Sequence, residues 1–496
     1  MAESVVLALD VGTSGVKAVA CDAAGRPSMS RQRNYGLNTP SAGWVEQDLD
    51  EIMAASVGVL RDLVDGGVEP GSVAAIGVTA QMFNIVAADE RGRPLAPMLS
   101  WLDQRAAPQA AAFARECPPD EQYRRFGAVI TAKDILPRIF WLREAWPEVW
   151  QKTTFLLDCK EAVVAALTGA VVTDAAGASA FRLLDPTSRD WDPARAESAG
   201  VPIDRLPPVR RATDLAGRLR DEIAHLTGLP AGTPVAVGAG DVAASQVGSG
   251  AVEVGDVHLS LGTAVYFGIT VDRPVPDPSR RLGVIGHADP AHWILWLEIA
   301  TGGAALAWLM RTLEGSAVEH SDLDEMVEAA AADMDGLMFA PWLSGERVPL
   351  FDDRLRGAFV GLSLRHRRGH LIRAVMEGVA CQIRWAWEYG LAFGIPVGTI
   401  RAVGGGGIGR AWTSIIADTI GLPLEVVADA PIAGARGAAA CALVGSGLAP
   451  DLATVARTTR VARTVEPDPQ RRSRGDERFD RFQRLHAALA PLFAGG

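Results

Sequence analysis

The feature that most constrains the fold is an apolar segment, residues 5–9, that runs directly into Asp10-Val11-Gly12-Thr13-Ser14-Gly15-Val16-Lys17. The apolar residues predict a buried strand that ends at an acid. Gly12 allows a tight turn and a close approach of the backbone to a ligand. Such a turn can direct backbone N–H groups and the Thr13 hydroxyl at a phosphate, while the Asp10 carboxylate holds Mg²⁺ through water. The alternative is an ordinary hairpin in which Asp and Gly are turn residues.

The same plan recurs near the middle of the chain. Within residues 257–267, two apolar segments that predict strands flank the turn Leu261-Gly262-Thr263, and no acid precedes the glycine. Two Gly-Thr hairpins about half a chain apart suggest two related domains, each cradling part of one nucleotide's phosphate chain. That is the arrangement of the actin-like ATPase fold.

Length and composition fit a multidomain enzyme. A chain of 496 residues predicts two to four domains. The net charge of −11 argues against nucleic acid as a partner. Five scattered cysteines form no CxxC pair, which indicates a reduced, cytoplasmic protein without a zinc site. The N-terminus lacks a basic region, so we expect no signal peptide. Residues 292–310 are almost uncharged but contain Glu298 and Gly302-Gly303, which predicts a strand, a turn and a helix rather than a membrane span.

Gly238-Ala239-Gly240-Asp241 places an acid between glycines at the end of a predicted strand. A carboxylate there can accept the proton of a substrate hydroxyl while the oxygen attacks phosphorus. The alternative is a simple turn Asp.

A mixed apolar and polar wall is predicted from two segments, Gln81-Met82-Phe83 and residues 100–105, which read Ser-Trp-Leu-Asp-Gln-Arg. A small sugar or polyol needs this mixture, because its C–H faces are apolar and its hydroxyls polar. The alternative is a core Met and a surface pair formed by Asp103 and Arg105.

A glycine run, Gly404 to Gly409, follows a predicted strand and precedes a predicted helix. It satisfies GxGxxG, and Glu425 and Asp429 lie about 20 residues further on, as in a dinucleotide-binding fold. The run equally suits the adenosine or phosphates of ATP at a helix N-terminus, or a turn that lets helix and strand pack closely.

The hydrophobic pattern predicts alternating strands and helices. Strands are expected at residues 73–79, 84–88, 235–239, 399–403 and 424–427. Helices are expected at residues 134–144, 160–167, 321–334, 371–391, 410–420, 434–444 and 477–492.

The motifs together resemble the FGGY carbohydrate kinase family, and within it the xylulokinases, from about residue 4 to about residue 447. The most specific part of the match is C-terminal, where Leu343-Ser344-Gly345-Glu346-Arg347-Val348-Pro349, residues 356–362 and residues 370–378 resemble the family signature.

The resemblance implies an α/β fold with two ribonuclease-H-like (actin-like ATPase) domains and an interdomain cleft. It divides the chain into an N-terminal domain at 1–250, a C-terminal ATP-binding domain at 251–450 and a tail at 451–496. It implies ATP and Mg²⁺ as cofactors and Asp241 as general base, with Asp10 at the metal. ATP would be bound by Gly12, Thr13, Ser14, Lys17, Gly262, Thr263, Gly405, Gly406 and Gly407. The sugar would be bound by Gln81, Met82, Phe83, Trp101, Asp103 and Asp241.

The departures from the family pattern bear on the substrate. Xylulokinases typically have Gln-Met-His-Gly where this chain has Gln-Met-Phe83-Asn84, and Asn where it has Val242. Two polar sugar contacts thus become apolar, which disfavours D-xylulose and favours a tetrose, a deoxysugar or a polyol. An NAD-dependent oxidoreductase that uses the glycine run and a non-catalytic sugar sensor remain as alternatives. The expected partners are ATP and a small sugar or polyol, and a homodimer is compatible with this assignment.

Overall fold

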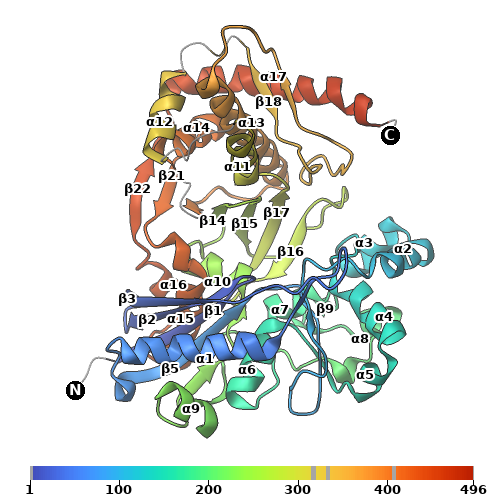
Figure 1. The fold of residues 1–496 in the computed structure, drawn as a ribbon, viewed down its shortest axis with the longest axis vertical. Coiled ribbons are helices and arrows are strands. Elements are labelled where there is room, and N and C mark those ends of the chain that lie inside the picture. The colour runs from blue at the N-terminus through green and yellow to red at the C-terminus, as the bar shows by residue number, and fades with distance from the viewer. Residues whose placement is uncertain (1–3, 314–319, 331–333, 335, 405–408, 495–496) are drawn as a thin grey trace. The chain divides into compact units, whose positions relative to one another are not determined.

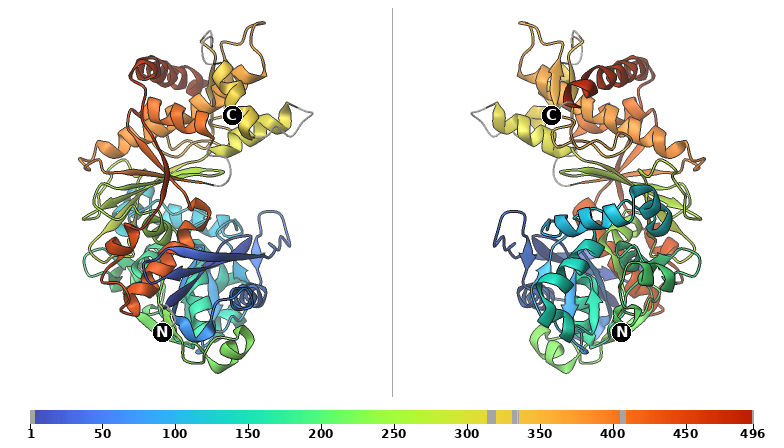
Figure 2. Two further views of the ribbon diagram at one scale, coloured as in Figure 1. Left: turned by 90° about the vertical axis from the view of Figure 1, so that its left-hand side faces the viewer. Right: turned by 90° about the vertical axis from the view of Figure 1, so that its right-hand side faces the viewer.

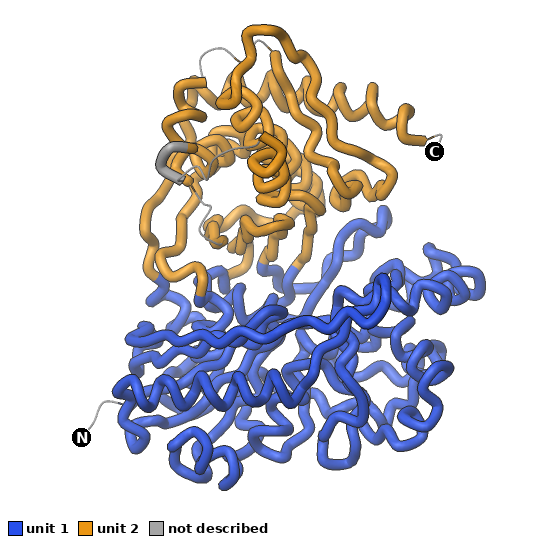
Figure 3. The backbone as a smooth tube through the Cα atoms, in the orientation of Figure 1, with its two compact units in different colours: residues 1–252, 270–294, 432–459 blue, residues 253–269, 295–431, 460–496 orange. Residues whose placement is uncertain are grey.

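The structure is a computed structural model that describes residues 4–313, 320–330, 334, 336–404 and 409–494. It divides into two compact units (Figure 3). Unit 1 comprises Met1–Val252, Thr270–Ile294 and Ile432–Thr459, and unit 2 comprises Glu253–Ile269, Leu295–Pro431 and Arg460–Gly496. The units are discontinuous in sequence, so the linear division at residues 250 and 450 does not coincide with them and stays a proposal about sequence domains.

Unit 1 is built on a seven-stranded sheet with the order β11-β12-β5-β1-β2-β3, in which β13 also pairs with β5 (Figure 1). Its strands are β1 (Val5–Val11), β2 (Gly15–Asp22), β3 (Pro27–Asn34), β5 (Val73–Ala80), β11 (Leu215–Arg218), β12 (Pro234–Ala236) and β13 (Ala239–Gly240). β1 pairs antiparallel with β2 and parallel with β5. β1 is buried along most of its length because it lies in the middle of the sheet, whereas β3 is polar and exposed at the edge.

Helices pack on this sheet and on one another. In unit 1 they are α1 (Leu49–Asp65), α2 (Ala107–Glu116), α3 (Pro119–Phe126), α4 (Ile135–Ala145), α5 (Pro147–Lys152), α6 (Cys159–Thr168), α7 (Ala175–Ala180), α8 (Pro193–Ser198), α9 (Asp221–Thr227), α10 (Asp241–Gly248), α15 (Ala433–Gly445) and α16 (Leu452–Ala456). α1 runs along one face of the sheet (Figure 2). It begins at the N-cap Asp48, whose side chain accepts from the Asp50 backbone N–H. Its buried stripe includes Ile52, Val59 and Leu63.

The remaining strands of unit 1 form short pairs. They are β4 (Glu46–Gln47) with β7 (Met98–Leu99), β6 (Val86–Ala88) with β8 (Phe155–Leu157), and β9 (Leu184–Asp185) with β10 (Asp190–Trp191). β16 (Gly283–Gly286) packs against α7 within this unit.

Glycines allow α15 to pack unusually closely. A Cβ at Gly437 would lie 1.8 Å from the Ala244 carbonyl oxygen on α10. A Cβ at Gly77 on β5 would lie 2.0 Å from the Ala438 carbonyl oxygen on α15. Only hydrogen fits at these distances. The close packing fixes the N-termini of α10 and α15, where Asp241 and Gly434 stand.

Unit 2 repeats the strand plan of unit 1. β14 (Val257–Leu261) pairs antiparallel with β15 (Val265–Val271) and parallel with β20 (Ile400–Val403). These strands belong to a sheet in which neighbouring strands follow the order β17-β15-β14-β20-β21-β22. Its other strands are β17 (Trp293–Ile299), β21 (Leu424–Val427) and β22 (Val461–Val465). This confirms the half-chain duplication predicted from the two Gly-Thr hairpins.

The helices of unit 2 are α11 (Gly303–Thr312), α12 (His320–Ala329), α13 (Arg368–Leu391), α14 (Arg410–Ile420) and α17 (Pro469–Phe493), and β18 (Met338–Ala340) pairs with β19 (Ala358–Val360). α13, α14 and α17 pack on one another. Trp342, Cys381 and Phe482 are in the core between these elements.

Most predicted elements are confirmed, including the strand and helix within residues 292–310. Several boundaries differ. The helix predicted at 321–334 ends at Ala329, the helix predicted at 371–391 begins at Arg368, and the strand predicted at 235–239 is divided into β12 and β13. The strand predicted at 84–88 begins only at Val86, because the backbone N–H of Asn84 is bonded to the Asp158 carboxylate instead of a sheet. The final helix begins at Pro469, earlier than predicted, because Asp468 caps it. Within the described segments, no helix is both long and apolar enough to cross a membrane.

Candidate active site

Two carboxylates of unit 1 lie at the ends of β1 and β13, the two strands that pair with the same stretch of β5. Asp10 stands near the end of β1, opposite Thr79 of β5 in the parallel ladder. β13 pairs with the same stretch of β5, with Ala239 opposite Thr79, and leads directly into Asp241. The carboxyl ends of parallel strands share one edge of a sheet. The fold therefore brings together two acids that lie far apart in the sequence.

The electrostatics of this pair are those of a crowded anionic site. Burial raises the pKa of Asp10 to about 6, opposed by the cation of Lys17, which stands opposite it on β2. Burial, followed by the charges of Asp10 and Asp158, raises the pKa of Asp241 to about 8. The Asp241 carboxylate accepts from the Val242 backbone N–H at 2.9 Å. A cation at this place would relieve the mutual repulsion of these acids, and oxygen donors are what Mg²⁺ prefers.

The N-terminus of α15 reaches the same place. A Cβ at Gly434 would lie 2.6 Å from the Asp10 Oδ2 atom, so the backbone of the first turn lies directly against this carboxylate. The positive end of a helix stabilises negative charge nearby. Nothing in the sequence of the alanine-rich helix marked Gly434 as a site residue, because its role depends on packing alone.

The first phosphate hairpin is tied to the predicted sugar segment. The Gly12 N–H donates to the Gly15 carbonyl at 2.9 Å and closes the turn. The Trp101 Nε1–H donates to the Thr13 hydroxyl at 3.0 Å, and Gln47 donates to the Thr13 carbonyl at 3.0 Å. Ser14 is exposed at the tip of the turn. The fold thus brings Thr13 and Trp101 together, and their contacts with phosphate and with sugar stay predictions.

Gln81, Met82 and Phe83 follow β5 and lie beside Asp241. Gln81 is buried and donates to the Gln47 side chain at 2.7 Å. The Met82 sulfur would lie 2.4 Å from a Cβ on Gly240, so Met82 packs directly against the residue before Asp241. Phe83 has a left-handed backbone, with φ 66°, which is uncommon for a bulky residue. Gln47 is a neighbour that sequence reasoning missed, because it comes from a distant strand.

A buried clamp holds this segment, and sequence reasoning missed it too. One oxygen of Asp158 accepts from the Asn84 backbone N–H at 3.0 Å, the Asn84 side chain at 2.9 Å and the Cys159 N–H at 2.7 Å. The Asn84 side chain also donates to the Gln81 carbonyl and accepts from the Trp101 N–H. The Asn84 side chain therefore links the two segments that were predicted to bind the sugar.

Asp103 has an internal role in this structure. Its side chain has no exposed surface, and its oxygens accept from the Val45 N–H at 2.6 Å, the Arg105 N–H at 3.0 Å and the Arg105 Nε at 2.8 Å. Arg105 in turn pairs with Glu46 at 2.8 Å and lies over the Trp44 ring at 3.9 Å. The alternative of a surface pair is thus wrong, because Asp103 and Arg105 form a buried network, and direct contact of Asp103 with a sugar stays a prediction.

The second hairpin lies in unit 2 and packs on α11. The Gly303 N–H donates to the Gly262 carbonyl at 2.7 Å, and the Gly302 and Ala304 N–H groups donate to the Thr263 carbonyl at 2.9 Å and 3.1 Å. These bonds satisfy N–H groups of the helix terminus. They leave the Thr263 side chain exposed at the turn.

The signature segment of unit 2 is anchored by a buried acid. Glu346 is fully buried, and one of its oxygens accepts from the Ala300 and Arg347 N–H groups, each at 2.8 Å. Burial raises its pKa to about 8. The Thr301 and Ser344 hydroxyls lie 3.2 Å apart beside it. The predicted nucleotide residues Gly405, Gly406 and Gly407 lie outside the described residues.

Two units of the same strand plan, each with a Gly-Thr hairpin, define the actin-like ATPase class of fold. Comparison with known families agrees with this. Residues 5–248 match the N-terminal domain, and residues 257–446 the C-terminal domain, of the FGGY family of carbohydrate kinases. The chain belongs to this family. It is a carbohydrate kinase, and kinases of this family use ATP as a substrate.

Individual relatives carry two activities. The chain is 28% identical to a gluconokinase of Bacillus subtilis over 84% of this chain and 82% of that one. It is 27% identical to the xylulose kinase of Escherichia coli K12 over 98% of this chain and 100% of that one. The crystal structure of xylulose kinase from Rhodospirillum rubrum superimposes with a TM-score of 0.89, at 28% identity over 99% of each chain. These matches do not favour the oxidoreductase and sensor alternatives.

Proposed function

We propose that this kinase transfers the γ-phosphoryl group of ATP to a hydroxyl of a small sugar or polyol, with Asp241 as the general base. The observation that carries the proposal is that Asp10 and Asp241 end two strands that both pair with β5, close enough for the charge of Asp10 to raise the pKa of Asp241. A phosphoryl transfer needs a proton acceptor at the attacking hydroxyl and a charged group that positions the phosphates.

The proposed steps follow from these residues. The substrate hydroxyl attacks the γ-phosphorus, and its proton passes to an Asp241 carboxylate oxygen. The new O–P bond forms as the bond from the γ-phosphorus to the bridging oxygen breaks, and ADP leaves. An elevated pKa makes Asp241 a stronger base than an exposed carboxylate, which favours proton transfer near neutral pH. Thr13, Lys17 and the Gly12 backbone hold phosphate oxygens.

Asp10 fits a magnesium role, because it supplies an oxygen donor in a site with an excess of negative charge. Mg²⁺, when bound, offsets the charge of the phosphates. In unit 2, Gly262 and Thr263 are proposed to contact the phosphates, and Gly405, Gly406 and Gly407 the adenosine.

The substrate is proposed to differ from D-xylulose. Phe83 and Val242 are apolar where xylulokinases carry sugar-contacting polar residues, and Val242 is buried. Asn84 cannot replace the missing contacts, because its side chain is already bonded to Gln81, Asp158 and Trp101. A hydroxyl placed against an apolar wall loses its water and gains no hydrogen bond.

The direct test is Asp241→Asn in an ADP-release screen across ketoses, aldonates and sugar alcohols. We expect kcat to fall by about 10²- to 10⁴-fold, with ADP binding retained. Asp221→Asn is a matched control, since it also changes the first residue of a unit 1 helix but is exposed. Near-normal turnover by Asp241→Asn would contradict the assignment of the base. Thermal protection by NAD equal to that by ADP would instead revive the oxidoreductase alternative.

A further inference from the structure

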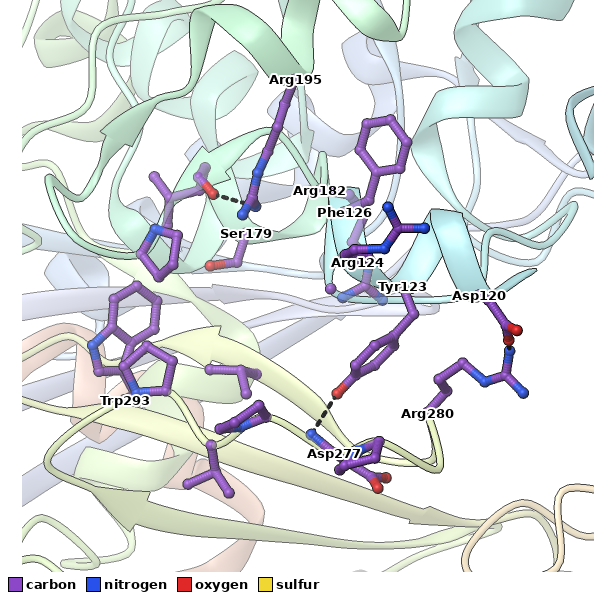
Figure 4. Close-up of a pocket in the computed structure, with 18 residues that line it drawn as sticks. Asp120, Tyr123, Arg124, Phe126, Ser179, Arg182, Arg195, Asp277, Arg280 and Trp293 are labelled. Atoms are coloured by element: carbon purple, nitrogen blue, oxygen red, sulfur yellow. Dashed lines mark hydrogen bonds and ion pairs between the residues drawn. The ribbon is translucent and has the colours of Figure 1, made fainter. Parts of the chain in front are cut away.

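A cavity of about 830 Å³ lies within unit 1, apart from the proposed sugar contacts (Figure 4). It is lined by residues of α3, of the chain from α7 to β9, of α8, and of the segment 274–284 together with Trp293. None of the six residues proposed to bind the sugar is among its lining residues. The volume is that of a site for a whole organic molecule.

The walls of the cavity are held by specific bonds. The Tyr123 hydroxyl of α3 accepts from the Asp277 N–H at 2.8 Å, which ties the helix to the facing segment. The Asp277 carboxylate accepts hydrogen bonds from three backbone N–H groups of the turn that follows it. An ion pair between Arg280 and Asp120 joins the same two walls (Figure 4). On the opposite wall, the Gly286 N–H donates to the Ser179 hydroxyl at 3.0 Å. Hydrogen bonds and an ion pair between separate segments therefore hold the walls of the cavity in place.

Three further arginines line the cavity from three different elements. Arg182 follows α7, and its Nε–H donates to the Asp134 carboxylate at 3.3 Å. Arg195 of α8 pairs with Asp192 at 3.1 Å and donates to a carbonyl at 2.8 Å. Arg124 of α3 is exposed, and within the described part of the chain its side chain forms no hydrogen bond or ion pair. A guanidinium has five N–H donors, so each of the three retains donors for a ligand.

The rest of the lining is apolar and aromatic. Trp293, Tyr123 and Phe126 contribute rings, and prolines of the segment 274–278 contribute flat aliphatic surface. The indole of Trp293 is stacked by the Arg189 guanidinium at 4.2 Å, which fixes its orientation. A ligand for this lining needs an anionic group for the arginines and an apolar or flat body for the rings.

We propose that this cavity is a second ligand site, which binds a phosphate ester of a sugar or a nucleoside. A phosphate dianion presents three terminal oxygens in different directions, and guanidiniums from separate elements can each engage one of them. A free phosphate would leave the aromatic wall without a partner. The site is independent of the phosphoryl-transfer chemistry, and the proposal stands or falls without it.

The site has a physical connection to the sugar segment. The Arg182 guanidinium lies 5.5 Å from the centre of the Phe83 ring, and both residues have a left-handed backbone, with φ 62° and 66°. Such backbones persist in bulky residues only where surrounding contacts fix them. A phosphate that draws Arg182 toward the cavity changes its stacking on Phe83. We expect ligand binding to alter KM for the sugar more than kcat.

The test is isothermal titration calorimetry on the full-length protein with saturating MgADP, so that the proposed nucleotide site is filled. The probes are AMP, ribose 5-phosphate and inorganic phosphate. We expect one phosphate ester to bind with one site per chain, and inorganic phosphate at least tenfold more weakly. Whether AMP or ribose 5-phosphate binds identifies the body of the ligand.

Arg124→Glu should weaken that binding by about tenfold or more, because it removes a charge-assisted donor and adds repulsion. Arg125→Glu is the matched control, since it is the adjacent exposed residue on α3 but does not line the cavity. Asp241→Asn should bind the ester normally, which separates this site from the base. The proposal is overturned if neither ester binds beside MgADP or if inorganic phosphate binds equally well. It is also overturned if Arg124→Glu binds the ester like the unmodified protein, or if Arg125→Glu weakens binding as much as Arg124→Glu does.

Discussion

Replacing Asp158 by Asn separates the two roles of the buried clamp. Asp158 is 2% exposed, and one oxygen accepts three N–H groups, while Oδ2 is buried with no hydrogen-bond partner among the described residues. Burial, followed by the charge of Glu161, raises the pKa of Asp158 to about 7. Asn keeps the accepting oxygen and cannot ionise, so the variant should hold Asn84 in place while removing a titrating group.

The sign of the effect follows from linkage. The pKa of Asp158 is higher in the folded chain than in the unfolded one, where it is about 4. At pH values between these two pKa values, the folded state therefore binds more protons than the unfolded state. The stability that protonated Asp158 contributes is fully present below pH ~4 and is lost as the pH rises through about 7. The free energy of unfolding should fall by up to about 1.4 kcal/mol per pH unit in this window. From pH 5 to pH 7, the free energy of unfolding of Asp158→Asn should therefore rise by about 2 to 3 kcal/mol relative to that of the unmodified protein.

Asp158→Ala provides the contrast. It leaves three buried N–H donors without an acceptor, at about 1–3 kcal/mol each, so we expect a loss of roughly 3 kcal/mol or more at pH 5. At pH 7 the loss should be smaller by the same ~2 to 3 kcal/mol, because Ala cannot ionise either, and Asp158→Ala should remain less stable than Asp158→Asn at both pH values. Chemical denaturation followed by fluorescence at pH 5 and pH 7 measures both effects, with the exposed Asp65→Asn as a control that should not change the pH dependence. The reasoning is refuted if Asp158→Asn has the same pH dependence as the unmodified protein, or is destabilised as strongly as Asp158→Ala.

Three further predictions follow from the packing and from the substrate segment. Phe83→His combined with Val242→Asn should raise kcat/KM for D-xylulose by about 10²-fold or more, measured against erythritol, L-xylulose and gluconate; if D-xylulose is already the best substrate of the unmodified protein, this interpretation of the pocket is wrong. Gly437→Ala should lower the melting temperature strongly, because its Cβ would lie 1.8 Å from the Ala244 carbonyl oxygen, and an unchanged calorimetric trace would contradict the close packing. Glu346→Gln should make unfolding less sensitive to pH between about 5 and 8, because burial raises the pKa of this acid and the amide cannot titrate; equal pH profiles by calorimetry would refute the assignment.

Local patterns predicted the elements well, for reasons that lie in short stretches of chain. β1 and β14 were predicted from runs of apolar residues that end at a turn glycine, since a central strand is buried on both faces. α14 and β21 have the predicted bounds because glycines and polar residues mark their ends. The final helix was predicted too short because its first turns are highly charged and exposed, so apolar spacing does not mark them.

The sequence by itself determined the duplicated strand–Gly-Thr–strand plan, the order of the family motifs and the acids at strand ends. These depend on residues that are adjacent in the chain, so pattern and spacing reveal them. Tertiary structure alone decided the two buried hydrogen-bond networks, one around Asp103 and one around Asn84 and Asp158. Their hydrogen bonds join segments up to 74 residues apart.

The division into units and the second cavity also depend on long-range packing. Residues 432–459 belong with unit 1 because α15 packs on α10 and β5, which its alanine-rich sequence permits but does not specify. Arg124, Arg182 and Arg195 look like ordinary charged residues in the sequence. They share a cavity only because the chain folds α3, α8 and the segment 274–284 around one space, and a side chain's surroundings are set by neighbours in space rather than in sequence.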